Sequence, residues 1–230
     1  MNEQFQRFAL LLTSEQIEKI NKAKVAIIGL GGVGSVATLA LARNGVKNFI
    51  LCDFDEVQLS NINRQLIANF NTLGMKKTDV CEKMIKEINP EASVKVISER
   101  FGPETTLFAN DFDYLIDAID DLDNKCLLIK MCLESKKTFI SSMGTGDKFD
   151  PTLFEVTDIS KTSSCPFAHL LKSELKKLGI EHLKVIYSKE KPTRFRSTES
   201  SYRANASSIS FVPSVAGLII SSEVVKDLIN

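Results

Sequence analysis

An apolar run that leads directly into a glycine-rich turn constrains this chain more than any other feature. Residues 25–28 are Val-Ala-Ile-Ile, and an aspartate stands 19 residues beyond the last glycine of the turn. Such a segment is typical of a nucleotide-binding βα unit, because glycines let the backbone approach phosphate at a helix N-terminus and the later acid accepts ribose hydroxyls. The residues predicted to contact a nucleotide in this way are Gly29, Gly31, Gly32, Gly34 and Asp53.

Strand-like runs alternate with helical patterns along the first 150 residues. The runs cover 24–28, 48–52, 94–98, 113–117 and 137–141, and the helical patterns cover 34–44, 77–89 and 122–135, with a shorter one near 104–109. Alternation of this kind is typical of a parallel sheet with helices on both faces. The predicted fold class is therefore α/β, with a Rossmann-like, doubly wound and mostly parallel sheet.

The pattern changes after residue 150. Strands are expected at 153–157 and 183–187, a basic helix at 166–178, and an apolar C-terminal helix from Pro213. The polar, serine-rich residues 188–208 predict a mobile crossover loop. At 230 residues the chain fits a single domain. Within it we expect a nucleotide-binding part at 1–150 and a substrate-facing C-terminal extension at 151–230.

Composition excludes some classes of protein and leaves others open. The five cysteines are odd in number and form no CxxC pair, which argues against a disulfide framework and a Cys₄ zinc site and favours free thiols in the cytoplasm. No signal peptide is expected at the N-terminus, and no apolar stretch approaches the roughly 20 residues that span a bilayer. A cytoplasmic protein without a membrane segment is predicted.

Net charge gives no hint of a partner, since Lys+Arg and Asp+Glu each total 29. Its distribution does, because residues 169–203 hold nine basic and four acidic side chains, a local charge of +5. Such a run is either a solvated surface or a surface for a phosphate backbone. The basic residues are Lys172, Lys176, Lys177, Lys184, Lys189, Lys191, Arg194, Arg196 and Arg203.

Further polar groups follow the aspartate of the fingerprint. Asn61, Arg64 and Gln65 stand close together, and the guanidinium fork suits the oxygens of a polyphosphate. Lys76 and Lys77 begin the next helical pattern, where the helix dipole disfavours cations. That local cost indicates a function for Lys77, such as reaching a phosphate.

Acidic residues cluster at the end of the fourth predicted strand, the end at which open parallel sheets bind ligands. Of Asp117, Asp120 and Asp121, one of the last two is expected to cap the following helix. A carboxylate here is suited to Mg²⁺ that bridges phosphates. The two histidines have no acid partner at triad spacing, so no Ser-His-Asp site is predicted.

Together, these residues resemble the ThiF/ubiquitin-activating superfamily, whose members use ATP to adenylate carboxylates. The resemblance implies ATP and Mg²⁺ as cofactors. It makes Asp53 the ribose acid, Asn61 and Arg64 the phosphate-binding pair, Lys77 the lysine near the α-phosphate and Asp120 the Mg²⁺ ligand. It also implies a homodimer in which an N-terminal arginine reaches the partner's ATP, and Arg7 is the candidate.

The second half resembles the tRNA threonylcarbamoyladenosine dehydratases within that superfamily. The similar segments are 142–162, the Cys-Pro-Phe-Ala of 165–168 and residues 183–190. This resemblance implies ATP-dependent dehydration, or cyclisation, of the threonylcarbamoyl group on the tRNA adenosine next to the anticodon. The carboxylate is adenylated and then captured within the same modified base, with release of AMP and pyrophosphate. A sulfur-relay protein is a further candidate partner.

An apolar N-terminal cluster also predicts a homodimer. A capping box of Thr13 and Gln16 predicts a short helix that ends near Ala23. Phe5, Phe8 and residues 10–12 (three leucines) precede this helix and need cover. A two-fold dimer would bury them in an isologous interface.

Three other functions compete with the dehydratase. The first is activation of a ubiquitin-like or sulfur-carrier protein at the same ATP site, which the missing CxxC pairs disfavour. The second is an NAD-dependent oxidoreductase, which has no need of Arg64, Lys77 and Asp120. The third is a non-catalytic scaffold, which the intact set of charged residues disfavours.

Overall fold

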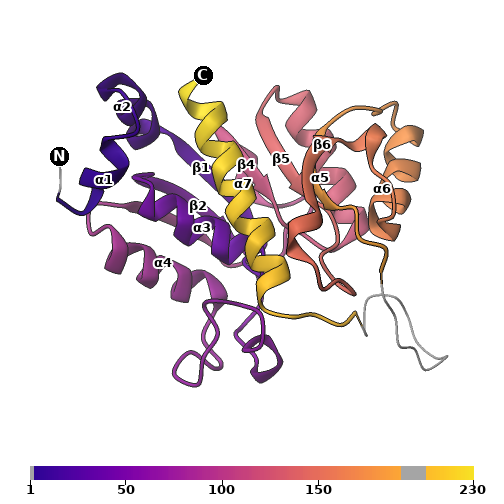
Figure 1. Ribbon diagram of the computed structural model, residues 1–230, viewed down its shortest axis with the longest axis horizontal. Helices are drawn as coiled ribbons and strands as arrows, with labels where there is room; N and C mark the ends of the chain where they lie inside the picture. Colours follow the sequence, from indigo (N-terminus) through magenta and orange to yellow (C-terminus); the bar gives the residue numbers. More distant parts are fainter. Residues whose placement is uncertain (1–2, 193–205) are drawn as a thin grey trace.

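The computed structural model describes residues 3–192 and 206–230, and these build one seven-stranded sheet (Figure 1). Six strands are parallel, and the seventh pairs antiparallel at one edge. The strands are β1 (Lys24–Ile28), β2 (Asn48–Cys52), β3 (Ser93–Ile97), β4 (Tyr114–Asp117), β5 (Thr138–Ser142), β6 (Phe154–Asp158) and β7 (Lys184–Ser188), in the order β3-β2-β1-β4-β5-β7-β6. The predicted α/β class with a mostly parallel sheet is confirmed.

Helices cover both faces of this sheet, as the doubly wound prediction requires. One face carries α2 (Ser14–Lys22), α3 (Gly34–Arg43), α4 (Lys77–Ile88) and α7 (Phe211–Ile229); the other carries α5 (Leu122–Glu134) and α6 (Pro166–Lys177). Alternation along β1 explains the two layers, because Val25 and Ile27 pack with the first set while Ala26 and Ile28 pack on the opposite face. The shorter elements are α1 (Gln6–Ala9), η1 (Glu3–Phe5), η2 (Leu59–Asn61), η3 (Thr106–Ala109), η4 (Pro151–Leu153) and η5 (Ile159–Lys161).

Two helix starts follow the predicted capping chemistry. The Thr13 hydroxyl accepts from the Gln16 amide at 3.3 Å, and the Gln16 side chain accepts from the Thr13 amide at 3.0 Å, which completes the capping box of α2. At α5 the Asp121 carboxylate accepts from the Asn124 amide at 3.0 Å. Of the two candidate aspartates, Asp121 is therefore the cap.

Helix α7 lies across α3, and glycine makes the close approach possible. A Cβ at Gly217 would stand 2.5 Å from the Val33 carbonyl oxygen, so no side chain fits there. Figure 1 shows α7 running over the middle of the sheet, between the half that holds β1 and β2 and the half that holds β5 and β6. The C-terminal helix therefore joins the two parts of the chain that the sequence distinguishes.

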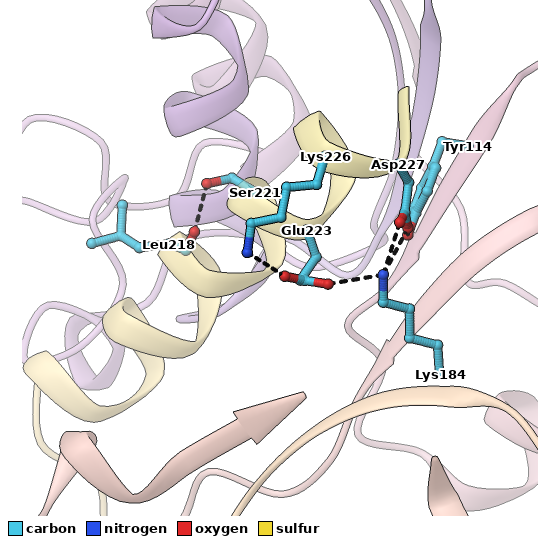
Figure 2. A network of polar contacts seen from close by, with 7 residues as sticks. All are labelled: Tyr114, Lys184, Leu218, Ser221, Glu223, Lys226 and Asp227. Carbon is cyan, nitrogen blue, oxygen red and sulfur yellow. Dashed lines mark hydrogen bonds and ion pairs between the residues drawn. The ribbon is translucent and has the colours of Figure 1, made fainter. Parts of the chain in front are cut away.

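A polar network ties the last turns of α7 to the sheet (Figure 2). Lys184 at the start of β7 lies 2.9 Å from both Glu223 and Asp227, and the Tyr114 hydroxyl donates to Asp227 at 2.7 Å. These four residues form what we call the amino-end network, because Tyr114 and Lys184 begin their strands. The grouping of Lys184 with the phosphate-binding basic run is therefore wrong, since two carboxylates already engage this ammonium.

Other members of the basic run also have partners within the chain. Lys172 donates to the Thr162 carbonyl at 2.8 Å, Lys177 pairs with Glu174 at 2.7 Å, and Lys189 pairs with Glu155. Arg194, Arg196 and Arg203 lie outside the described residues, as does most of the predicted crossover loop 188–208.

The N-terminal apolar cluster is only partly open. Phe5 is buried, and Phe8 and Leu12 pack against the main core, so they need no partner subunit. Leu10 and Leu11 remain 86% and 82% exposed. The expectation that the whole cluster needs external cover is thus wrong for three of its five residues. No helix among the described residues is long and apolar enough to span a bilayer.

Candidate active site

A cavity of about 390 Å³ opens at the carboxyl ends of β1, β2 and β4. The strand order changes direction between β1 and β4, and open α/β sheets bind ligands at such a switch point. Nine of the eleven residues predicted for the site line this cavity, so the fold does gather them. They are Gly29, Gly31, Gly32, Asp53, Asn61, Arg64, Gln65, Lys77 and Asp120.

Asp53 connects the glycine turn to the end of β2. Its carboxylate accepts from the Leu30 amide at 2.6 Å and from the Asp55 amide at 2.8 Å. Burial raises the pKa of Asp53, while the charge of Lys77 and these two hydrogen bonds partly offset the rise. A buried carboxylate in this position has the geometry of a ribose-binding acid next to a phosphate-binding turn.

The glycine turn is shaped by close backbone contacts. Gly29 has φ +89°, and a Cβ there would lie 2.6 Å from the Ala118 carbonyl oxygen. Gly34 does not line the cavity, and a Cβ on it would overlap the Gly29 carbonyl oxygen at 1.8 Å. Gly34 instead allows the helix to pack closely against the strand. The structure therefore does not support the predicted contact of Gly34 with a nucleotide.

The segment 61–65 presents polar groups to the cavity from a tight turn. The Asn61 side-chain oxygen accepts from the Gln58 amide at 3.0 Å, and Arg64 Nη1 donates to the Ser60 carbonyl at 2.6 Å. Nη1 also donates to the Asn63 side-chain oxygen at 3.0 Å, so two bonds within the turn orient the guanidinium before any ligand arrives. Gln65 Oε1 is buried and makes no hydrogen bond within the described part of the chain, and such an atom beside a cavity indicates a ligand or water partner.

Lys77 faces the same cavity from the first turn of α4. Its side chain is 5% exposed, and Nζ lies 2.7 Å from an Asp55 carboxylate oxygen. This pairing accounts for the cation at a helix start, because the acid compensates the unfavourable helix dipole. A phosphate that enters the cavity would find the ammonium already oriented.

Asp120 lies on a turn that a buried network holds in place. Asp117 accepts from Lys125 Nζ at 2.8 Å and from the Ser141 hydroxyl at 2.7 Å, and Lys125 also donates to the Ile119 carbonyl at 2.9 Å. The side chains of Asp117 and Lys125 are fully buried. We call Asp117, Lys125 and Ser141 the carboxyl-end network.

The sequence prediction missed this network. Its one local signal is a lysine on the face of α5 that otherwise carries Cys126 and Ile129 toward the core. A charge among core positions is rarely left unpaired, so Lys125 could have been matched to an acid.

Arg7 is not brought to the cavity within one chain. It belongs to α1, and its neighbour Phe8 packs beside Gly45, which precedes β2 at the amino end of the strands. The cavity lies at the opposite, carboxyl end.

Few of the described residues are suited to bind a metal ion or to act as a thiol nucleophile. In residues 3–192 and 206–230 no group of three or more His, Cys, Asp or Glu side chains is arranged to hold a metal ion alone. All five cysteines are buried free thiols, and burial raises the pKa of Cys52, which lines the cavity, to about 12. A thiol with so high a pKa is a poor nucleophile.

Comparisons with known proteins agree with this geometry. The ThiF family model matches residues 2–230. The chain is 41% identical to a tRNA threonylcarbamoyladenosine dehydratase of Bacillus subtilis, over 100% of this chain and 96% of the relative. It is 37% identical to the Haemophilus influenzae enzyme of the same name, over 76% and 68% of the two chains.

Solved structures give the same match. The crystal structure of the Escherichia coli tRNA N6-threonylcarbamoyladenosine dehydratase superposes with a TM-score of 0.91 at 30% identity, covering 98% of this chain and 94% of that one. A second structure of that enzyme, in complex with ATP, superposes with a TM-score of 0.89 at 30% identity, covering 98% and 93%.

Proposed function

The chain belongs to the ThiF family, and on that premise we propose that it is an ATP-dependent tRNA threonylcarbamoyladenosine dehydratase. The observation that carries the proposal is the convergence of Asp53, Arg64, Lys77 and Asp120 on one cavity. The relatives that match over the whole chain have this activity in their names, and a structure of one of them holds ATP. Residues 1–150 would bind the nucleotide and residues 151–230 the tRNA side.

The chemistry has two steps. An oxygen of the threonylcarbamoyl carboxylate attacks the α-phosphorus of ATP, the bond to the β-phosphate oxygen breaks, and pyrophosphate leaves. An atom of the ureido group in the same side chain then attacks the activated carbonyl carbon, AMP leaves, and a ureido N–H proton is lost. The tethered nucleophile acts at a high effective concentration, so the enzyme needs no thiol.

The residues of the cavity divide this work. The backbone of Gly29, Gly31 and Gly32 lies against the phosphates, and Asp53 accepts the ribose hydroxyls. Asn61 and Gln65 donate neutral hydrogen bonds. Arg64 and Lys77 stabilise the charge that gathers on the phosphates as the bond to pyrophosphate breaks.

Mg²⁺ fits this site through Asp120. Its carboxylate is exposed and lines the cavity. Magnesium is usually held by one or two carboxylates together with substrate phosphates, which suits a site with no larger cluster of acids among the described residues. When bound, the ion neutralises phosphate charge, and Asp120 fixes where it does so.

A homodimer completes the proposal. Arg7 stands in α1, and Leu10 and Leu11 immediately after that helix are the most exposed large apolar side chains of the described residues. For Arg7 to reach the ATP cavity of the second copy, the isologous contact has to set these leucines against the partner's surface near the carboxyl ends of its strands. The reaction belongs in the cytoplasm, where its tRNA substrate is found.

The experiment is ATP–pyrophosphate exchange with threonylcarbamoylated tRNA, with unmodified tRNA and with no tRNA. Exchange stimulated only by the modified tRNA supports the dehydratase, and equal rates in all three defeat it. A small protein that ends in glycine–glycine is the fourth condition. Stimulation by that protein alone would favour the sulfur-carrier activator instead.

A further inference from the structure

A second cavity, of about 250 Å³, adjoins the first. The two share part of their lining, including Arg64, Asp120 and Thr145, so a molecule at that shared wall would touch both. The second cavity extends away from the glycine turn toward the ends of β5 and α6. Its other residues are Ser142, Met143, Gly144, Gly146, Phe167, Ala206 and Ser207.

Of the described residues, every one that lines the second cavity and not the first is uncharged, and the set mixes hydroxyl groups with apolar surface. Phe167 gives a buried aromatic face, and Ser142 and Ser207 carry hydroxyls. Gly144 lies against Phe167, where an added Cβ would stand 3.2 Å from the Phe167 Cβ. Such a lining suits a small neutral group with a methyl and a hydroxyl, and it does not suit a charge.

The wall formed by 206–208 is fixed to the rest of the cavity. The Asp147 amide donates to the Ser207 carbonyl at 2.9 Å, and the Asp147 carboxylate accepts from the Ser207 amide at 2.9 Å. Asn63 donates to the Ser208 carbonyl at 3.0 Å. Asp147 adopts φ +57°, an unfavourable conformation for a residue with a side chain. The second cavity is therefore a defined pocket, and a strained turn helps to hold its wall in place.

We propose that the second cavity binds the side chain of the carboxylic acid that is adenylated, with the carboxylate at the shared wall. This inference rests on the proposed function and adds where the acyl group lies. A carboxylate cannot enter the neutral part without a cation, so it stays beside Arg64. There it faces the phosphates in the first cavity, while the methyl and hydroxyl of the threonyl group enter the second.

This placement makes Phe167 a specificity-determining residue. Its ring contacts the threonyl methyl, so the enzyme prefers threonylcarbamoyl to glycylcarbamoyl tRNA. Contact with one or two extra carbon groups distinguishes substrates by about 10-fold or more. A nucleotide confined to the first cavity would not contact Phe167, which lines the second cavity and not the first.

The test compares Phe167→Leu with the matched control Phe112→Leu. Phe112 is also a buried phenylalanine on the α5 face of the sheet, and it lines neither cavity. The measurements are kcat/KM for exchange with threonylcarbamoyl and glycylcarbamoyl tRNA, and ATP affinity by calorimetry. Phe167→Met, whose flexible side chain adapts to irregular gaps, serves as a second variant in case the leucine variant folds poorly.

We expect Phe167→Leu to lower the threonyl-over-glycyl preference about 3- to 10-fold, with ATP affinity unchanged and Phe112→Leu like the wild type. An unchanged preference in both Phe167 variants, with an active wild type, overturns this inference and leaves the proposed function standing. An equal loss of preference in Phe112→Leu also overturns it. A wild type that ignores threonylcarbamoylated tRNA overturns both proposals.

Discussion

The two ends of the sheet carry polar networks of the same chemical kind in opposite surroundings. At the carboxyl end Asp117 and Lys125 are 0% exposed. At the amino end Lys184, Glu223 and Asp227 keep 32%, 16% and 29% of their side chains exposed (Figure 2). Both networks use a lysine with at least one acid, and both join a helix to the sheet.

The two exposures indicate what each network contributes. The buried pair has lost its hydration completely, so its members depend on each other and on Ser141, and their bonds fix the Ile119 backbone next to Asp120. The amino-end network stays partly hydrated and secures α7 without touching the cavity. We therefore expect the first to matter for both folding and catalysis, and the second for folding alone.

The largest expected effect is at Lys125. Lys125→Met leaves the Asp117 carboxylate buried without its partner, which should cost about 3–5 kcal/mol of unfolding free energy. Lys130→Met on the same helix, where the side chain is 50% exposed, should cost little. Urea denaturation of both variants measures the difference. Equal stabilities of the two variants would contradict the role of the buried pair.

The second-largest effect is at Arg64, at the same end of the sheet, where we expect slower catalysis with little loss of stability. Arg64→Ala should raise the barrier to adenylate formation by about 1.5–3 kcal/mol, because a charge-assisted contact to phosphate is lost. Its unfolding free energy should barely change, since within the described part of the chain the side chain bonds to its own turn, at Ser60 and Asn63. Single-turnover exchange and urea denaturation together test this. If the variant loses as much unfolding free energy as it gains in the barrier to adenylate formation, Arg64 acts by stabilising the fold.

Breaking the amino-end network should have a smaller effect. Lys184→Met should cost about 1 kcal/mol, because water still reaches Glu223 and Asp227, and these retain Lys226 and Tyr114 as partners. ATP affinity should match the wild type, since this network is remote from the cavity. A loss of several kcal/mol of unfolding free energy, or weaker ATP binding, would contradict the difference we expect between the two networks.

The smallest effect concerns pH. Burial acts to raise the pKa of Glu223, but hydrogen bonds from Lys226 and Lys184 outweigh it, and the pKa is lowered. The stabilising contribution is therefore complete above the ordinary value of 4.5 and is lost as the pH falls through the lower folded value. The stability difference between wild type and Glu223→Gln should be constant near neutrality and disappear on acidification. A stability difference that grows as the pH falls would mean that folding raises the pKa of Glu223 instead of lowering it.

Local patterns in the sequence predicted most of the fold. The expected strands agree with β1 to β7 within one residue, Thr13 caps its helix as predicted, and Asp121 is one of the two aspartates expected to cap α5. Period and capping are properties of neighbouring residues, so a single sequence carries them.

The failures share one cause, which is contact between residues of different elements. Lys184 counted as a free cation because Asp227 is 43 residues away, and Lys125 escaped notice because Asp117 belongs to another element. Phe5 and Phe8 counted as exposed because their cover comes from packing that spacing does not reveal. The second cavity depends on residues 142–146 meeting 206–208, which local patterns cannot predict.

The most direct test of the whole account is the reaction itself. Threonylcarbamoylated tRNA is incubated with the protein, ATP and Mg²⁺. The tRNA is then digested, and the masses of its nucleosides are measured by mass spectrometry. We predict conversion to a product lighter by one water, with one AMP formed for each nucleoside converted and none from unmodified tRNA. Unchanged threonylcarbamoyladenosine in the presence of protein that binds ATP would contradict the account.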